Sequence, residues 1–162
     1  MLTFKHYNIA DWLSFYRIAV APILLLFIWL DHRQIFSWLL LFSYATDAVD
    51  GYIARKFKLS SSKGAQLDSL GDQVTFVVAI IGLYYFEKEF VHSNLLFIGI
   101  VFSPYLIQML IAYFKYGKAT AFHTYLAKAS AILQSIFVLF ALFFFPDYTL
   151  FYIMIVIGVV ET

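Results

Sequence analysis

The stretch SYATDAVDGYIARKFKLSSSKGAQLDSLGDQ, residues 43–73, joins the ends of two long apolar segments and carries four aspartates. Each of these segments has the length and composition of a membrane helix, which needs roughly 20 residues to cross the hydrocarbon. A carboxylate near hydrocarbon is costly unless a cation or a polar partner compensates it. The sequence therefore predicts that a specific partner meets these carboxylates, which belong to Asp47, Asp50, Asp68 and Asp72.

The composition is that of an integral membrane protein. Of the 162 residues, 63% are hydrophobic and only 13% are charged, whereas a soluble domain averages roughly 45–50% apolar and about 25% charged residues. The length suits a single domain over residues 1–162. The absence of cysteine excludes disulfides, thiolate metal sites and thiol nucleophiles. A net charge of +1 gives no field that would attract nucleic acid.

Apolar segments follow one another along the chain and predict an all-α integral membrane protein with a bundle of six transmembrane helices. Five segments are long enough to span a membrane, at residues 12–30, 35–54, 67–86, 95–114 and 125–145. The sixth, residues 148–160, is short or truncated. The start of the chain, LTFKHYNIADWL at residues 2–13, fits either a short N-terminal interfacial helix or a disordered start.

The basic residues divide unevenly between the two sides of the predicted bundle. Only Arg33 and Lys88 fall on one side. The other nine fall on the opposite side: Lys5, Arg17, Arg55, Lys56, Lys58, Lys63, Lys115, Lys118 and Lys128. Because lysine and arginine are enriched in cytoplasmic loops, this asymmetry predicts a multi-pass protein whose termini and aspartate-rich loop face the cytoplasm.

Helical periodicity brings the four carboxylates together. On the first of the two helices, Asp47, Asp50, Gly51 and Ala54 lie within about one 100° arc. On the second helix the two aspartates are four residues apart and share a face, with Gly64 one turn earlier. The short link makes these helices antiparallel neighbours, so we expect all four carboxylates to converge at the cytoplasmic membrane surface.

Four convergent carboxylates need a cation, because they would otherwise repel one another and take up protons. Oxygen ligands without histidine or cysteine suit Mg²⁺, Mn²⁺ or Ca²⁺, and paired divalent ions are a common arrangement for attack at phosphorus. Gly51 and Ala54 leave open space for a nucleotide or diphosphate, and Arg55 can bind phosphate oxygens bidentately. Taken singly, each aspartate could instead be a hydrogen-bonded core group, and the small residues could be helix-packing surfaces.

These residues carry a resemblance to a known family. The pattern Asp-x2-Asp-Gly-x2-Ala-Arg-x8-Gly-x3-Asp-x3-Asp is present without a gap or a substitution. It resembles the signature of the CDP-alcohol phosphotransferases, also called CDP-alcohol phosphatidyltransferases. The family is also similar in having six transmembrane helices with this motif across the second and third. The eight motif residues are Asp47, Asp50, Gly51, Ala54, Arg55, Gly64, Asp68 and Asp72.

The resemblance implies an enzyme of phospholipid biosynthesis. An acceptor alcohol attacks the phosphorus next to the lipid moiety of CDP-diacylglycerol, CMP leaves, and a phosphodiester forms. The resemblance also implies a homodimer and two divalent ions, Mg²⁺ or Mn²⁺, bound by the four aspartates, with Asp72 also acting as the base for the alcohol. It further implies a nucleotide site made of Asp47, Gly51, Ala54, Arg55 and Gly64.

The segment NIADWLSFYRIAVAP, residues 8–22, narrows the acceptor. It resembles the Pro-Asn-x-Leu-Thr-x2-Arg opening of phosphatidylglycerophosphate synthases and their relatives. Arg17 matches that opening, whereas Asp11 replaces the usual Asn and Ser14 the usual Thr. The resemblance favours glycerol 3-phosphate as the acceptor and gives Arg17 a role in binding acceptor or phosphate. Alternatively, Arg17 is an anchor that extends to the membrane surface.

A second cytoplasmic group of basic residues lies in KYGKATAFHTYLAKASAILQ, residues 115–134. These side chains could bind the phosphate of an acceptor, or they could bind anionic lipid headgroups and enforce topology. The Lys-x2-Thr-x2-Gln pattern associated with phosphatidylglycerophosphate synthases is not present at HTYLAK, which leaves inositol phosphate and phosphatidylglycerol as alternative acceptors. The residues of this group are Lys115, Lys118, His123 and Lys128.

Two other functional classes use acidic residues in membranes. A cation transporter would need polar residues near the membrane midplane, whereas here the acids gather at one face. A membrane prenyltransferase would need a second aspartate-rich motif, but the only aspartate after Asp72 is Asp147. Both alternatives are therefore less favoured than phosphatidyl transfer.

Overall fold

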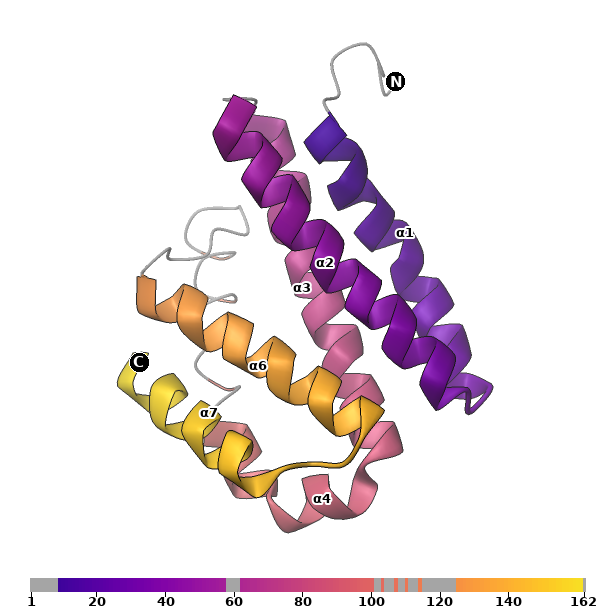
Figure 1. Ribbon diagram of the computed structural model, residues 1–162, viewed down its shortest axis with the longest axis vertical. Coiled ribbons are helices and arrows are strands. Elements are labelled where there is room, and N and C mark those ends of the chain that lie inside the picture. The colour runs from indigo at the N-terminus through magenta and orange to yellow at the C-terminus, as the bar shows by residue number, and fades with distance from the viewer. Residues whose placement is uncertain are drawn as a thin grey trace. The chain divides into compact units, whose positions relative to one another are not determined.

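The computed structural model describes residues 9–57, 62–100, 103, 107, 110, 114 and 125–161, which form helices joined by short turns (Figure 1). No strand occurs among these residues, which confirms the all-α class. The helices are α1 (Ile9–Trp29), α2 (Arg33–Phe57), α3 (Ser62–Phe86), α4 (Lys88–Ser93), α6 (Tyr125–Phe143) and α7 (Tyr148–Glu161).

Five of the predicted apolar segments correspond to α1, α2, α3, α6 and α7, with bounds that agree to within a few residues at most ends. The segment at residues 95–114 is helical at residues 95–100, and most of its remainder lies outside the described residues. Of the start predicted at residues 2–13, residues 2–8 also lie outside them, and residues 9–13 form the beginning of α1.

Helix α4 occupies a stretch that the sequence analysis does not include among the predicted helices. Most of its residues are polar, but two apolar residues, Phe90 and Val91, are buried on one side of the helix. The Asn94 side-chain amide donates a hydrogen bond to the Phe90 carbonyl at 2.9 Å and satisfies an acceptor in the last turn. Glu89 lies in the first turn, where a negative charge favours the helix dipole. Burial and end contacts thus form a helix too short for periodicity to reveal.

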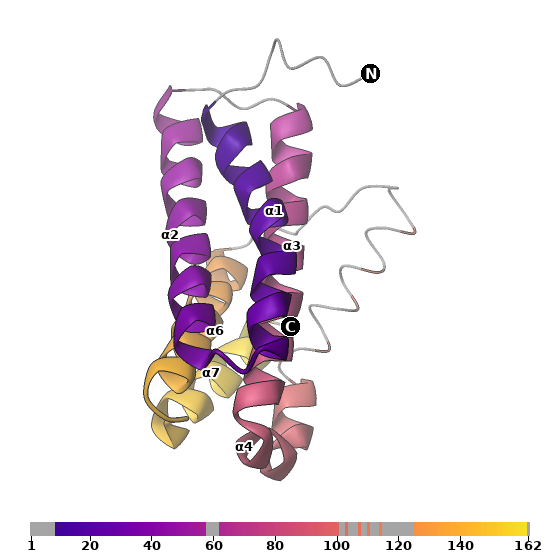
Figure 2. The same ribbon diagram turned by 90° about the vertical axis from the view of Figure 1, so that its right-hand side faces the viewer.

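The chain divides into two compact units, Met1–Val78 and Ala79–Thr162. In the first unit, α1 and α2 pack against each other (Figure 1), and the part of α3 up to Val78 runs alongside α1 (Figure 2). Asp31 makes the turn between α1 and α2 with φ of 58°, a left-handed conformation that aspartate tolerates better than most residues. This tight turn makes the two helices antiparallel.

The interior of the first unit changes character along its length. Near the turn between α1 and α2 it is mainly apolar, with Leu24, Phe36 and Leu40 completely buried, and the buried Ser37 hydroxyl donates to a carbonyl of its own helix. Toward the other end of the same helices the buried residues become polar and include Ser14 and Arg17. Since an unpaired buried polar group is costly, the polar end needs a network of partners.

The second unit has an aromatic interior. The rings of Phe90, Phe137 and Phe151 come from α4, α6 and α7 and pack with centroids 5.0–5.8 Å apart. This separation is in the range of favourable aromatic pairs. These three residues therefore fix how α4, α6 and α7 pack within this unit.

Large apolar side chains cover much of the described surface. Trp29 is 78% exposed and Leu96 is 71% exposed, while Arg17 is only 1% exposed. Two described segments, Trp12–Trp29 and Gln66–Phe86, are long and apolar enough to cross a membrane, and shorter apolar helices cover Ala129–Phe143 and Tyr148–Gly158. An apolar exterior with a charged group inside is the arrangement expected of helices in lipid.

Candidate metal and nucleotide site

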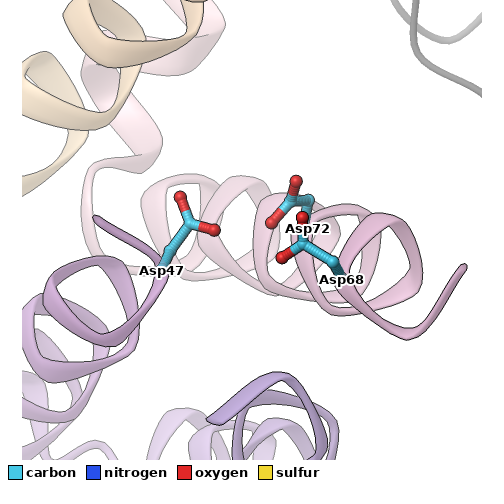
Figure 3. Close-up of side chains that lie close together, drawn as sticks. All are labelled: Asp47, Asp68 and Asp72. Carbon is cyan, nitrogen blue, oxygen red and sulfur yellow. The ribbon is translucent and has the colours of Figure 1, made fainter. Parts of the chain in front are cut away.

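Three aspartates from two helices meet in the first unit (Figure 3). Asp47 projects from α2, and Asp68 and Asp72 project from the same side of α3. Each residue contributes one carboxylate oxygen to a group in which all oxygens lie within 4.8 Å of one another. The convergence that the sequence predicts is therefore present for these three carboxylates.

Helix geometry explains why the three carboxylates meet. Asp68 and Asp72 are four residues apart, which places them about one turn apart on a single face of α3. Helices α2 and α3 run in opposite directions (Figure 1), and the 3.4 Å contact between the Ser43 and Thr75 hydroxyl groups shows that they are neighbours here. Asp47 lies in the second half of α2 and the other two lie in the first half of α3, so antiparallel packing brings them level.

Arg17 of α1 joins the three aspartates from the inside of the unit. Its Nη1 donates hydrogen bonds to Oδ1 of both Asp47 and Asp72. Its Nη2 donates to Oδ1 of Asp68 at 2.5 Å. The Arg17 side chain is 1% exposed, whereas the three aspartate side chains are 44–46% exposed. The carboxylates are thus compensated from within and open on the other side.

Gly71 lets Arg17 reach the carboxylates. A Cβ atom at this position of α3 would lie 3.3 Å from Arg17 Nε and 3.4 Å from the Ser14 carbonyl oxygen. Such distances are tighter than ordinary van der Waals contact, so a side chain here would press on the guanidinium. The missing side chain therefore allows α1 and α3 to approach closely at the site.

A second polar contact lies beside the cluster. The hydroxyl groups of Ser43 on α2 and Thr75 on α3 are buried and lie 3.4 Å apart. Ser43 is one turn before Asp47, and Thr75 is about one turn after Asp72. Ser43, Thr75 and Gly71 belong to none of the motif positions that predicted the site. The sequence pattern that could have identified them is a small or hydroxylated residue one helical turn from an aspartate on an otherwise apolar helix.

Other predicted site residues are placed only by their backbone or not at all. Gly64 is half-buried in the first turn of α3. The remaining motif residues of α2 lie in its last turns, but their side chains are outside the described set, as is that of Lys128 in α6. Residues Lys115, Lys118 and His123 lie outside the described ranges. The α2 residues in question are Asp50, Gly51, Ala54 and Arg55.

The described donor set fits a divalent cation. Its three carboxylates supply only oxygen, which suits the hard ions Mg²⁺ and Mn²⁺ better than metals that prefer nitrogen or sulfur. The half-exposed carboxylates leave a path from solvent to the cluster. An ion bound here would compete with the Arg17 guanidinium for carboxylate oxygens.

Three relatives share parts of the chain. Over 79 residues, this chain is 33% identical to the "CDP-diacylglycerol--glycerol-3-phosphate 3-phosphatidyltransferase" of Yersinia pestis (strain Pestoides F). The matched region is 46% of this chain and 42% of that protein. The protein of the same name from Aquifex aeolicus is 30% identical over 91 positions, 56% of this chain and 51% of that protein. The matched region thus spans about half the length of these relatives or less.

A third relative and a family model extend the match. The "Cardiolipin synthase (CMP-forming) / mitochondrial hydrolase fusion protein" of Schizosaccharomyces pombe is 30% identical over 119 positions, 74% of this chain and 20% of that protein. The model of the CDP-alcohol phosphatidyltransferase family matches residues 7–162. That match includes α1, α2 and α3 together with the carboxylate cluster that they form. This protein therefore belongs to the CDP-alcohol phosphatidyltransferase family.

Proposed function

We propose that this protein transfers a phosphatidyl group from CDP-diacylglycerol to glycerol 3-phosphate and releases CMP. The observation that carries the proposal is the convergence of Asp47, Asp68 and Asp72, three residues of the eight-residue family signature, on one group of oxygens. The names of the Yersinia and Aquifex relatives support the choice of both substrates.

The proposed reaction is a single displacement at phosphorus. The acceptor hydroxyl oxygen forms a bond to the phosphorus that carries the diacylglycerol, and the bond from that phosphorus to the bridging oxygen of CMP breaks. Asp72 accepts the hydroxyl proton, because it lies at the cluster on an open side of α3. CMP leaves with the electron pair of the broken bond, and the lipid product carries the new phosphodiester.

The four signature aspartates, Asp47, Asp50, Asp68 and Asp72, would hold two divalent ions, Mg²⁺ or Mn²⁺, in this proposal. When bound, such ions neutralise the charge of a diphosphate and of the oxygens that enter and leave. Arg55 would hold the phosphate, and the nucleotide would lie against Asp47, Gly51, Ala54 and Gly64. Small residues suit this role because they let a flat base or a phosphate approach the helix backbone.

We also propose that the protein spans the membrane six times as a homodimer, with its site at the cytoplasmic face. The exposed apolar side chains support the membrane spans, and the nine-to-two division of basic residues supports the orientation. The homodimer rests on the family resemblance alone. A single cysteine at position 61, in the link after α2, tests the orientation. It should react with an impermeant reagent only from the cytoplasmic side, and labelling from outside intact cells would contradict the proposal.

The acceptor's phosphate is proposed to bind the basic group Lys115, Lys118, His123 and Lys128. The Lys-x2-Thr-x2-Gln pattern associated with phosphatidylglycerophosphate synthases is kept here only in its outer residues, so it does not decide the acceptor. Lys128 and Gln134 keep the outer residues of the Lys-x2-Thr-x2-Gln pattern, with Ala131 in place of threonine. Gln134 is buried and donates to the Ser130 hydroxyl at 3.2 Å, so its side chain is held within α6.

Phosphatidylglycerol is the second candidate acceptor. The name of the Schizosaccharomyces pombe relative, a CMP-forming cardiolipin synthase, supports phosphatidylglycerol as an acceptor. That relative matches a larger share of this chain than either synthase named above.

An acceptor panel tests the proposed function. The purified protein is supplied with CDP-diacylglycerol, Mg²⁺ and one acceptor at a time: glycerol 3-phosphate, serine, inositol, inositol phosphate or phosphatidylglycerol. CMP release and the lipid product are measured, with Asp68→Asn as the inactive control. We expect glycerol 3-phosphate to give the fastest release. Absence of CMP with every acceptor would overturn the proposed phosphatidyl transfer. Faster release with phosphatidylglycerol than with glycerol 3-phosphate would make phosphatidylglycerol the proposed acceptor.

A further inference from the structure

Arg17 is an unusual residue for its position. It lies in α1, within the apolar segment Trp12–Trp29, yet its side chain is 1% exposed. A long basic side chain in such a helix ordinarily extends toward the membrane surface and keeps its charge in water. Burial is costly for a guanidinium unless anions surround it. The position of Arg17 therefore requires the carboxylates that it contacts.

The contacts of Arg17 match this requirement. Its two terminal nitrogens bind three carboxylates that come from two other helices. Gly71 leaves just enough room for the guanidinium, with Nε and Cζ at 3.3 and 3.4 Å from a Cβ built there. The side chain is thus held in a fitted slot between α1 and α3, which differs from the surface anchor considered in the sequence analysis.

Arg17 and a metal ion would serve the same carboxylates. When all three aspartates are ionised, as ligands of a divalent ion are, they carry three negative charges against the one positive charge of Arg17, which leaves a net charge of −2 among these four groups. A divalent ion at the cluster neutralises the remaining charge, but it must share or take carboxylate oxygens that now accept hydrogen bonds from Arg17. A unit positive charge a few ångström from the ion also repels it.

We propose that Arg17 is an internal cation that holds Asp47, Asp68 and Asp72 together, and that a divalent ion binds by displacing Arg17 from carboxylate oxygens. Arg17 then stabilises the protein in the absence of divalent ions and lowers the affinity of the cluster for them. This inference rests on the proposed metal site and adds to it a competitor supplied by α1. It makes Arg17 a positioning residue for the aspartates.

The test compares the purified protein with Arg17→Met, Arg17→Lys and the control Arg33→Met, which removes an arginine from the opposite end of α2. Thermal unfolding is followed in excess chelator, and Mn²⁺ binding is measured from the electron paramagnetic resonance signal of the free ion.

In chelator, Arg17→Met should unfold at a lower temperature than the unsubstituted protein. Its dissociation constant for Mn²⁺ should fall by at least about tenfold, because a nearby repelling charge is gone. Arg17→Lys should lie between the two, and Arg33→Met should change neither quantity.

A double variant keeps the test decisive if Arg17→Met does not fold. In Arg17→Met/Asp68→Asn one carboxylate is neutralised, so the repulsion left by the missing guanidinium is smaller. The double variant should then be more stable in chelator than Arg17→Met, and it should fold where Arg17→Met does not, because residues in direct contact are coupled. A double variant that is no more stable than Arg17→Met would overturn the inference.

The failure of this inference can be told apart from that of the proposed function. If the unsubstituted protein binds Mn²⁺ and Arg17→Met binds it equally or more weakly, the competition is wrong while the metal site stands. If the unsubstituted protein binds no Mn²⁺, both the metal site and the competition are overturned.

Discussion

The two units of the chain differ in the side chains that fill their interiors. In Met1–Val78, a buried guanidinium binds three carboxylates that are 30, 51 and 55 residues away in the sequence. In Ala79–Thr162, aromatic rings of α4, α6 and α7 pack against one another. Among the described residues of this second unit, buried polar side chains bond to groups four residues away, as Asn94 at the end of α4 does to Phe90 and Gln134 to Ser130 within α6.

This difference separates what stabilises the protein from what the family's chemistry needs. Aromatic packing accounts for the second interior without any further partner. Charged groups in an interior often contribute little or no net stability compared with apolar groups of the same size. A charged interior that links three helices is therefore better explained by function than by stability, and substitutions in the two interiors should have different consequences.

The largest effect on activity is expected from Asp68→Asn. Asp68 contributes to the group of oxygens that fits a divalent ion and is bound by Arg17 Nη2. Both Mn²⁺ affinity and the rate of CMP release should fall, the rate by more than about 10⁴-fold, because loss of metal compensation is expected to cost more than loss of a base. Asp147→Asn is the matched control in the second unit, where the aspartate caps the backbone of Leu150. Equal losses in both variants would break the comparison.

A smaller loss of activity is expected from Asp72→Asn. If Asp72 is the base, the variant should still bind CDP-diacylglycerol while CMP release slows by about 10²–10⁴-fold. Lipid-nucleotide affinity must be measured beside the rate, because Asp72 also belongs to the carboxylate group. A loss of binding as complete as in Asp47→Asn would show that Asp72 acts only as a ligand.

In the second unit the expected change is in stability. Phe137 is 1% exposed and contacts two other rings, so Phe137→Ala should leave a cavity. Such a substitution costs about 3–5 kcal/mol in the free energy of unfolding of soluble cores, and this value is an upper bound where lipid replaces water. Mn²⁺ affinity should stay unchanged. Phe145→Ala, at a 63% exposed position, is the control. A tenfold change in Mn²⁺ affinity in Phe137→Ala would contradict the separation of roles.

The smallest effect is expected from Gly71→Ala compared with Gly99→Ala. Alanine is favoured over glycine inside a helix by about 0.8–1.0 kcal/mol. At Gly99 no atom lies within 4 Å of an added Cβ, so the variant should gain stability. At Gly71 the added atom presses on Arg17, so that gain should be reduced or reversed. An equal gain at both positions, measured by thermal unfolding in chelator, would show that the slot around Arg17 is loose.

Much of the fold follows from periodicity and length. Apolar runs predicted α1, α2, α3, α6 and α7, because each is long compared with a helical turn and bounded by polar residues. The short helix α4 was missed because it is only six residues long and its two buried residues give too little periodicity. Six membrane spans stay a prediction, since two described segments meet the length and composition of a span.

The site was predictable where it depends on one or two helices. The spacing of Asp68 and Asp72 fixes a shared face, and the short link after α2 brings Asp47 beside them. The role of Arg17 depends on how α1 packs against α3, and neither local spacing nor composition determines that contact. For the same reason, Gly71 was not selected before the structure placed it beside Arg17.

The decisive experiment for the proposed metal site measures how CMP release depends on divalent ions. The purified protein is given CDP-diacylglycerol and glycerol 3-phosphate, first with excess chelator and then with Mg²⁺ or Mn²⁺ restored. We expect chelation to abolish CMP release and either ion to restore it, because the three convergent carboxylates supply a site made only of oxygen. Full turnover in excess chelator would contradict the assignment of Asp47, Asp68 and Asp72 to a metal site.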